Sequence, residues 1–214
     1  MTLRLPLIYP ITDAALCGLS HHEQARQLID AGASMIQVRD KNSMSRDLYD
    51  ECVAVVKIAE GRNVRVIVND RADIAVMAGA GGVHVGRDDL PPDAVRSVVG
   101  ERMLVGFSTH NVEQAIRATR LPVDYIAIGP IFSTKSKVNP DPVVGLDGLK
   151  SVRDAVGHFP LVAIGGIDIS NIAQVLSGGA DSVAVISALF AGGRPISENY
   201  RHLVAQAKTA AALR

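Results

Sequence analysis

The stretch Leu161-Val-Ala-Ile-Gly-Gly-Ile167 places four consecutive apolar residues directly before two glycines. A strand with one solvent-exposed face alternates apolar and polar residues. A continuous apolar run is instead typical of a strand covered on both faces, as in a parallel sheet. The chain contains eight runs of this kind, rich in Ile, Val and Ala. They occupy residues 7–11, 35–38, 64–68, 82–85, 103–106, 125–128, 161–164 and 182–185. The sequence therefore predicts eight buried parallel strands.

The segments between these runs have the pattern of helices. Ser20 and Glu23 match a capping box ahead of a helical apolar face. Asn111, with Gln114 three residues later, indicates another helix start. The last helix is expected at about residues 197–212.

Eight strand–helix units in 214 residues predict an α/β fold, a single (β/α)8 TIM barrel domain over residues 1–214. A chain of this size buries roughly 70% of its unfolded surface, enough for one large core. The alternative on pattern alone is a doubly wound open sheet. In the barrel, the site is expected at the C-terminal ends of the strands.

The composition argues against several partners and compartments. The 22 basic and 22 acidic side chains balance, whereas a nucleic-acid-binding protein usually has an excess of Lys and Arg. Cys17 and Cys52 cannot form a disulfide framework, which favours a reducing, cytoplasmic location. The first residues do not match a signal peptide, and no apolar stretch is long enough to span a bilayer. We therefore expect neither a nucleic acid nor a membrane partner.

Charged side chains gather where the predicted strands end. Asp70 and Asp89 follow neighbouring strands, so their carboxylates are placed to share Mg²⁺. Arg39, Lys41 and Lys137 follow other strands and suit a small polyanion beside that metal. Each of these residues alone could instead form an exposed ion pair.

A separate phosphate site is indicated after the last strands, where TIM barrels commonly bind phosphate. Gly165-Gly166 permits close approach of the backbone, Ser187 adds a hydroxyl, and the Ser133-Thr134-Lys-Ser136 loop adds others. The alternative is that the two glycines only form a tight turn.

No nucleophile with an adjacent base stands out in the sequence. His84 lies within a strand and is expected to be a hydrogen-bonded interior residue, while His110 could contact the site or begin a helix. His21 and His22 open a helix and are expected to be solvated. The residues therefore favour electrostatic catalysis of transfer or lyase chemistry at a carbon that bears a diphosphate.

Motifs spread over almost the whole chain resemble those of the thiamine-phosphate synthase family. They are Tyr9-Pro-Ile-Thr-Asp13, Gln37-x-Arg39-x-Lys41, Asn69-Asp70-Arg71, Gly82-Val-His84-Val-Gly86 with Asp89, Ser108-x-His110, Gly129-Pro-Ile131 with Thr134-x-Ser136-Lys137, Ile164-Gly-Gly-Ile167 and Ile186-Ser187. Each motif is weak alone, but the ordered set is specific.

The resemblance implies that the chain joins hydroxymethylpyrimidine diphosphate to a thiazole phosphate, giving thiamine phosphate and diphosphate. It implies that Asp70 and Asp89 hold Mg²⁺ and that Arg39, Lys41, Lys137 and Ser108 are catalytic. The pyrimidine diphosphate would be bound by Gln37, Val38, Arg39, Asp40, Lys41, Asn69, Ser108 and Lys137. The thiazole phosphate would be bound by Thr134, Lys135, Ser136, Gly166, Ile186 and Ser187.

The sequence departs from the family's usual pattern at Arg87, where Gln is common, and at Ser136, where Thr is common. Two alternatives stay open: a thiazole tautomerase-like isomerase, in which His110 would transfer the proton, and a non-catalytic thiazole-phosphate-binding paralogue. Neither has an evident use for Asp70, Asp89 and Lys137. We also expect that the segment 133–142 closes over the diphosphate and that the chain could form a homodimer.

Overall fold

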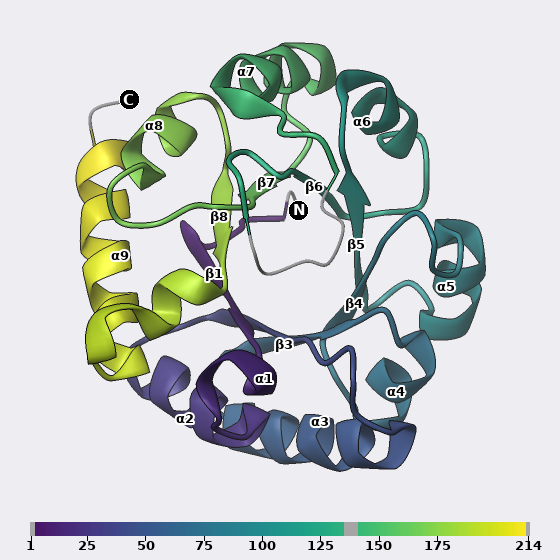
Figure 1. Ribbon diagram of the computed structural model, residues 1–214. Helices are drawn as coiled ribbons and strands as arrows, with labels where there is room; N and C mark the ends of the chain where they lie inside the picture. The colour runs from purple at the N-terminus through teal and green to yellow at the C-terminus, as the bar shows by residue number, and fades with distance from the viewer. Residues whose placement is uncertain (1–2, 135–140, 213–214) are drawn as a thin grey trace.

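The strands form a closed barrel in which every neighbouring pair is parallel. A computed structural model describes residues 3–134 and 141–212. Its strands are β1 (Ile8–Thr12), β2 (Met35–Val38), β3 (Arg65–Asn69), β4 (Gly82–Val85), β5 (Leu104–Thr109), β6 (Tyr125–Ile128), β7 (Leu161–Ile164) and β8 (Ser182–Val185). They pair in chain order, and β1 closes against β8, with Ile8 opposite Val183. Figure 1 shows the barrel end on.

The predicted (β/α)8 barrel is confirmed, and the open sheet is excluded because an open sheet would leave two edges unpaired. Three strands extend further than the apolar runs indicated. Thr12 at the end of β1 pairs with Val38 of β2. Asn69 at the end of β3 pairs with His84 of β4, and Thr109 at the end of β5 pairs with Ile128 of β6. Polar residues thus continue the ladders up to the edge where the site was expected.

Helices surround the barrel (Figure 1). They are α1 (Ala14–Cys17), α2 (His21–Asp30), α3 (Ser45–Ala59), α4 (Ala72–Met77), α5 (Pro92–Val99), α6 (Val112–Ala118), α7 (Gly145–Val156), α8 (Ile172–Ser177), the 3-10 helix η1 (Ser187–Gly193) and α9 (Ile196–Ala211). Ser20 and Glu23 form the predicted capping box of α2, and the Asn111 side chain caps α6 by accepting from the Gln114 N–H. No helix within residues 3–134 and 141–212 is long and apolar enough to cross a membrane.

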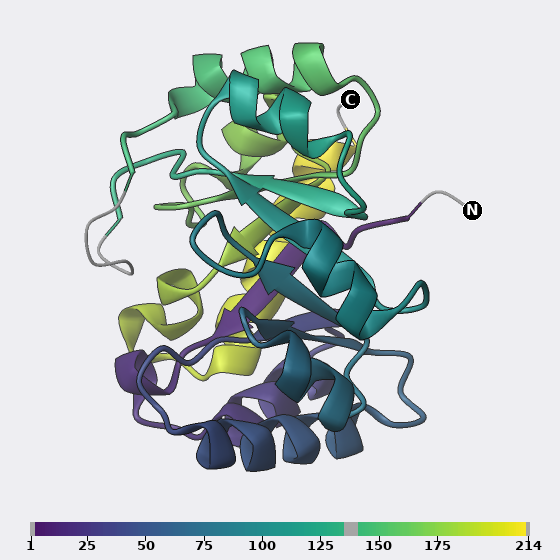
Figure 2. The same cartoon turned by 90° about the vertical axis from the view of Figure 1, so that its right-hand side faces the viewer.

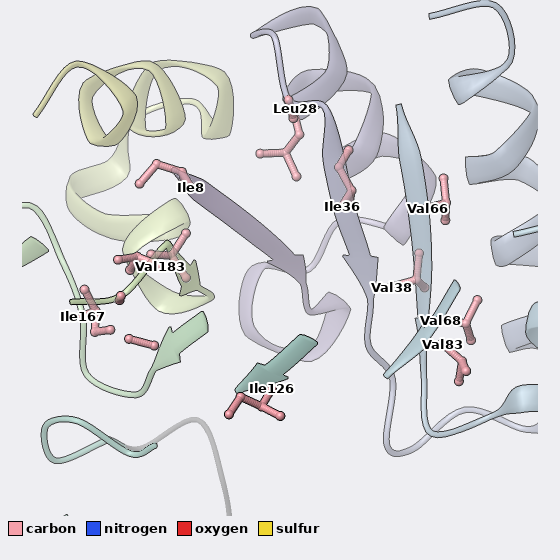
Figure 3. Close-up of a cluster of buried hydrophobic side chains, with 14 of the residues drawn as sticks. Ile8, Leu28, Ile36, Val38, Val66, Val68, Val83, Ile126, Ile167 and Val183 are labelled. Carbon is pink, nitrogen blue, oxygen red and sulfur yellow. The ribbon is translucent and has the colours of Figure 1, made fainter. Parts of the chain in front are cut away.

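The apolar core has two layers. The larger lies between strands and helices; Figure 3 shows Leu28, Ile36 and Val38 among its side chains. The smaller lies inside the barrel and consists of Tyr9, Ile11, Met35, Ile67, Tyr125, Ala127, Val162 and Ala184. Because alternate residues of each strand face inward and outward, both layers come from the same continuous apolar runs.

Two arginines form matching clamps outside the barrel. Arg96 of α5 donates to the carbonyls of Gly100, Met103 and Pro122 and pairs with Asp124 at 2.8 Å. Arg153 of α7 repeats these contacts with the carbonyls of Gly157, Phe159 and Gly179 and with the Asp181 carboxylate. Arg153, Gly157 and Asp181 follow their counterparts Arg96, Gly100 and Asp124 by the same number of residues. Each clamp ties the end of one helix to the two strands that follow it.

Candidate active site

A cavity of about 290 Å³ opens at the C-terminal ends of the strands. Among the residues that line it are most of those the sequence singled out. They are Gln37, Arg39, Lys41, Asn69, Asp70, Asp89, Ser108, Thr134, Gly166, Ile186 and Ser187. The structure thus brings together side chains from β2 to β6 and the loops after β7 and β8.

Two of the predicted site residues that the structure describes do not line the cavity. Val38 is fully buried in the outer core layer, and the Asp40 carboxylate faces His21 and Ser43. Lys135, Ser136 and Lys137 lie outside the described residues, as does most of the segment 133–142. The roles expected of these three residues and of that segment stay predictions.

The two candidate metal ligands lie next to one another. Burial raises the pKa of the Asp89 carboxyl most, the hydrogen bond from the Gly86 N–H at 2.7 Å opposes the rise, and the neighbouring Asp70 raises the pKa further. Asp70 also accepts a hydrogen bond from the Lys41 ammonium. Two adjacent carboxylates repel one another, and a divalent cation between them would relieve the repulsion.

This donor set fits Mg²⁺, which usually takes one or two carboxylates and completes its coordination with water and phosphate oxygens. No group of three or more His, Cys, Asp and Glu residues that could hold a metal occurs in the described parts of the chain. Asp70 and Asp89 would therefore leave most of the coordination sphere to water and to a phosphorylated ligand.

The cationic side of the cavity is held by acidic partners. Arg39 Nη1 donates to Asp13 Oδ2 at 3.0 Å, while the other oxygen of Asp13 caps α1 by accepting from the Leu16 N–H. The Arg39 side chain is only 17% exposed, so Asp13 fixes its direction. Arg87, at the position that departs from the family pattern, lines the same cavity but is largely exposed beside Asp88.

Asn69 contributes an unused donor. The residue is buried and lines the cavity, and its Nδ2 has no hydrogen-bond partner among the described residues. An unpaired buried amide is costly, so the arrangement suits a ligand that brings an acceptor.

The diglycine brings the β7 loop against the β6 loop. Gly165 and Gly166 both have positive φ, and a Cβ on Gly165 would lie 2.5 Å from Pro130 Cβ. The positive φ of both glycines is typical of the tight turn that the sequence left as an alternative, and their part in binding phosphate stays a prediction. Ser187 begins η1 at the same end of the cavity.

The histidines differ from one another more than the sequence suggested. His84 is buried and hydrogen-bonded, as expected, and it also reaches the cavity. His110 also lines the cavity; its Nδ1 donates to the Gly129 carbonyl at 2.6 Å, and its Nε2 lies 3.4 Å from Asp141 Oδ2. His22 is partly exposed and pairs with Glu51.

The expectation that His21 is solvated is wrong. Its side chain is 2% exposed, with Nδ1 2.7 Å from Thr12 Oγ1 and Nε2 3.2 Å from Asp40 Oδ2. The position follows from tertiary packing, because the first turn of α2 faces the loop after β2.

Sequence reasoning missed the two tyrosines inside the barrel. Tyr9 lines the floor of the cavity, and Tyr125 packs edge to face against it, with ring centroids 6.2 Å apart. Both hydroxyls are fully buried, and burial raises the pKa of each. The available signal was a tyrosine within an otherwise aliphatic strand, because a buried tyrosine hydroxyl needs a hydrogen-bond partner.

The chain matches a family model described as thiamine monophosphate synthase over residues 8–189. A thiamine-phosphate synthase of Koribacter versatilis is 46% identical, with 94% of this chain and 97% of that protein covered. One from Chloroflexus aurantiacus is 41% identical, with 86% and 85% covered.

A solved structure described as thiamine phosphate pyrophosphorylase from Pyrococcus furiosus superposes with a TM-score of 0.85 at 30% identity. The superposition covers 95% of this chain and 96% of the Pyrococcus furiosus chain. The sequence and structural matches extend over the strands and the loops that form the cavity. The chain thus belongs to the thiamine-phosphate synthase family of transferases.

Proposed function

We propose that this chain catalyses the Mg²⁺-dependent joining of hydroxymethylpyrimidine diphosphate to a thiazole phosphate, releasing diphosphate and forming thiamine phosphate. The observation that carries the proposal is the adjacent Asp70 and Asp89 carboxylates beside Lys41, at the mouth of a cavity that Arg39 also lines. An isomerase or a simple phosphate binder would have no use for this pair.

The diphosphate end of the substrate is the part that this chain's cations serve. Arg39 and Lys41 would neutralise the diphosphate oxygens, and the Asn69 amide, which has no partner among the described residues, and the Ser108 hydroxyl would donate to them. Bound Mg²⁺, held by Asp70 and Asp89, would supply Lewis-acid stabilisation of the negative charge that grows on the leaving diphosphate. Lys137 is proposed to add a further cation.

The proposed reaction is dissociative. The bond between the pyrimidine methylene carbon and the diphosphate oxygen breaks, and its electron pair leaves with diphosphate. The thiazole nitrogen then donates its lone pair to the methylene carbon and forms the new C–N bond. The chain's part is to stabilise charge and align the two reactants, so no protein nucleophile is required.

The second substrate is proposed to bind across the cavity. Gln37 would seat the pyrimidine ring from β2, while Thr134, Gly166, Ile186 and Ser187 would bind the thiazole phosphate from the opposite loops. Lys135 and Ser136 complete the set proposed from the sequence.

The test is incubation of the purified chain with both substrates and Mg²⁺, followed by measurement of thiamine phosphate and released diphosphate. We expect Asp70→Ala, or removal of divalent metal with EDTA, to lower the coupling rate by about 100-fold or more. Binding of thiazole phosphate, measured by calorimetry, should be largely retained.

The matched control is Asp73→Ala, which removes an exposed carboxylate paired with Arg71 outside the cavity and should leave the rate unchanged. Coupling at the wild-type rate in Asp70→Ala, or without any divalent metal, would contradict the proposal.

A further inference from the structure

Five side chains form a continuous row of hydrogen bonds across the floor of the cavity. Gln37 Nε2 lies 3.0 Å from Tyr9 Oη, which lies 3.2 Å from Tyr125 Oη. Tyr125 Oη lies 3.1 Å from His84 Nδ1, and His84 Nε2 lies 2.8 Å from Ser108 Oγ. The row joins two residues of the proposed substrate site, on β2 and β5, through three buried residues.

The backbone makes room for this row at one glycine. Gly106 of β5 pairs with His84 on one side and with Tyr125 on the other, so the two side chains meet in front of it. A Cβ on Gly106 would lie 2.2 Å from Tyr125 Cζ and 2.4 Å from His84 Nδ1. A residue with any side chain would separate the histidine from the tyrosine.

The chemistry of the groups gives the row a direction. The Gln37 amide nitrogen can only donate, so Tyr9 Oη accepts from it. Among the described residues, Tyr125 Oη is the acceptor within hydrogen-bond distance of the Tyr9 hydroxyl. If Tyr9 donates to it, Tyr125 Oη can donate in turn to His84 Nδ1.

In a neutral imidazole one ring nitrogen accepts and the other donates. The His84 ring is buried and both of its nitrogens face uncharged hydroxyl groups, so within the described parts of the chain no counter-ion contacts a protonated ring. The ring is therefore neutral near pH 7. Since Nδ1 accepts from Tyr125, Nε2 carries the proton and donates to Ser108 Oγ.

We infer that Tyr125 and His84 are positioning residues that keep the Ser108 hydroxyl proton free to be donated into the cavity, where it can bind a diphosphate oxygen. With the opposite tautomer, the Ser108 hydroxyl would donate to His84 Nε2 and would present only lone pairs to an anion. The inference rests on the proposed function for the identity of the anion, but the direction of the row can be tested without it.

The first experiment measures the tautomer directly. Long-range ¹H–¹⁵N spectra of the ¹⁵N-histidine-labelled protein, with His84→Gln used for assignment, should show His84 protonated on Nε2 and not on Nδ1 between pH 6 and 8. In Tyr125→Phe, the Nδ1 acceptor loses its donor and the ring should shift toward the Nδ1–H form. Wild-type protein with the Nδ1–H tautomer would overturn the inference, whether or not the chain makes thiamine phosphate.

The second experiment is a double-mutant cycle with Ser108→Ala. Tyr125→Phe should lower kcat about 10-fold with little change in KM, as expected for loss of a group that orients a substrate contact. In the Ser108→Ala background it should lower kcat no further. Tyr200→Phe, which changes a buried tyrosine of α9 outside the cavity, is the matched control and should leave kcat unchanged.

The outcomes separate the two proposals. An equal loss from Tyr125→Phe in both backgrounds would indicate a general structural role and overturn the inference, as would no loss in either. A wild-type chain that makes no thiamine phosphate would refute the proposed function, while the tautomer measurement would still decide the direction of the row.

Discussion

Asp40 holds the loop after β2 in a fixed shape. Its carboxylate accepts from the backbone N–H groups of Asn42 and Ser43, from the Ser43 hydroxyl, and lies against His21. Burial by itself would raise the pKa of Asp40, but these hydrogen bonds outweigh it and hold the pKa well below its usual range. Because Arg39 and Lys41 flank Asp40 in sequence, this residue supports the cationic side of the cavity without lining it.

Asp40→Asn should therefore destabilise the fold in a pH-dependent way. A depressed folded-state pKa gives stability that is fully present above the unfolded value of about 3.9 and is lost as the pH falls through the folded value. We expect a loss of about 2 kcal/mol at pH 7, and a difference from wild type that begins to shrink near the unfolded pKa of about 3.9 and continues to shrink as the pH falls toward the depressed folded-state value. Urea unfolding at several pH values measures it.

The control for this prediction is Asp30→Asn, which removes a largely exposed partner of Arg62 and should change stability by less than about 1 kcal/mol. A loss for Asp40→Asn that stays constant down to pH 3 would contradict the assignment of its stability to the ionised carboxylate.

At the residue scale, the sequence predicts the positions of those side chains that depend only on where the strands end. Asp70 and Asp89 lie together because neighbouring parallel strands end at one edge, and that follows from the order of the apolar runs. His21 was placed wrongly because its burial depends on Asp40 and Thr12, which are distant in sequence. The site roles themselves stay predictions.

Among the elements, β5 is closely constrained by both neighbouring strands at Gly106. Gly106→Ala should destabilise the protein by about 1–3 kcal/mol, because its Cβ would overlap Tyr125 and His84 and the strands would have to move apart. Chemical denaturation measures the loss, and the same variant should disturb the His84 ring ¹⁵N signals.

Gly148→Ala is the matched control in helix α7. Its Cβ would lie 2.6 Å from Val144 Cγ1, so this partly exposed side chain would have to shift, while alanine favours a helix by up to about 1 kcal/mol relative to glycine. The two effects oppose each other, so the loss of stability should be smaller than for Gly106→Ala. If Gly106→Ala were equally well tolerated, the close contact across β5 would not be the constraint described above.

The elements themselves were largely predictable. Continuous apolar runs located all eight strands, because both faces of each strand are buried. The ends of β1, β3 and β5 were missed because Thr12, Asn69 and Thr109 are polar, and only pairing with the next strand extends the ladder to them. Periodicity does not report such pairing.

At the scale of the whole molecule, the Arg96 and Arg153 clamps hold helices to strands at positions that do not line the cavity. Arg96→Met removes donors from the carbonyls of Gly100, Met103 and Pro122 and leaves Asp124 without its cation. We expect a loss of about 2–4 kcal/mol in unfolding free energy, with an unchanged coupling rate at temperatures where the variant is folded. Thermal and urea unfolding together with the coupling assay measure both.

Arg117→Met, which breaks an exposed pair with Glu113, should cost less than about 1 kcal/mol and is the control. An Arg96→Met variant of wild-type stability would show that the clamp is dispensable, and reduced coupling in a fully folded variant would show that it communicates with the cavity.

The closure of β1 against β8 also decides where the chain can be held. Because β1 runs toward the cavity and α9 runs back from it, the start of β1 and the end of α9 lie on the side of the barrel away from α1 and η1, as Figure 2 shows. A fused protein or a solid support attached at either end would therefore sit behind the molecule. In copies attached in this way, the cavity would face the solution that contains the substrate.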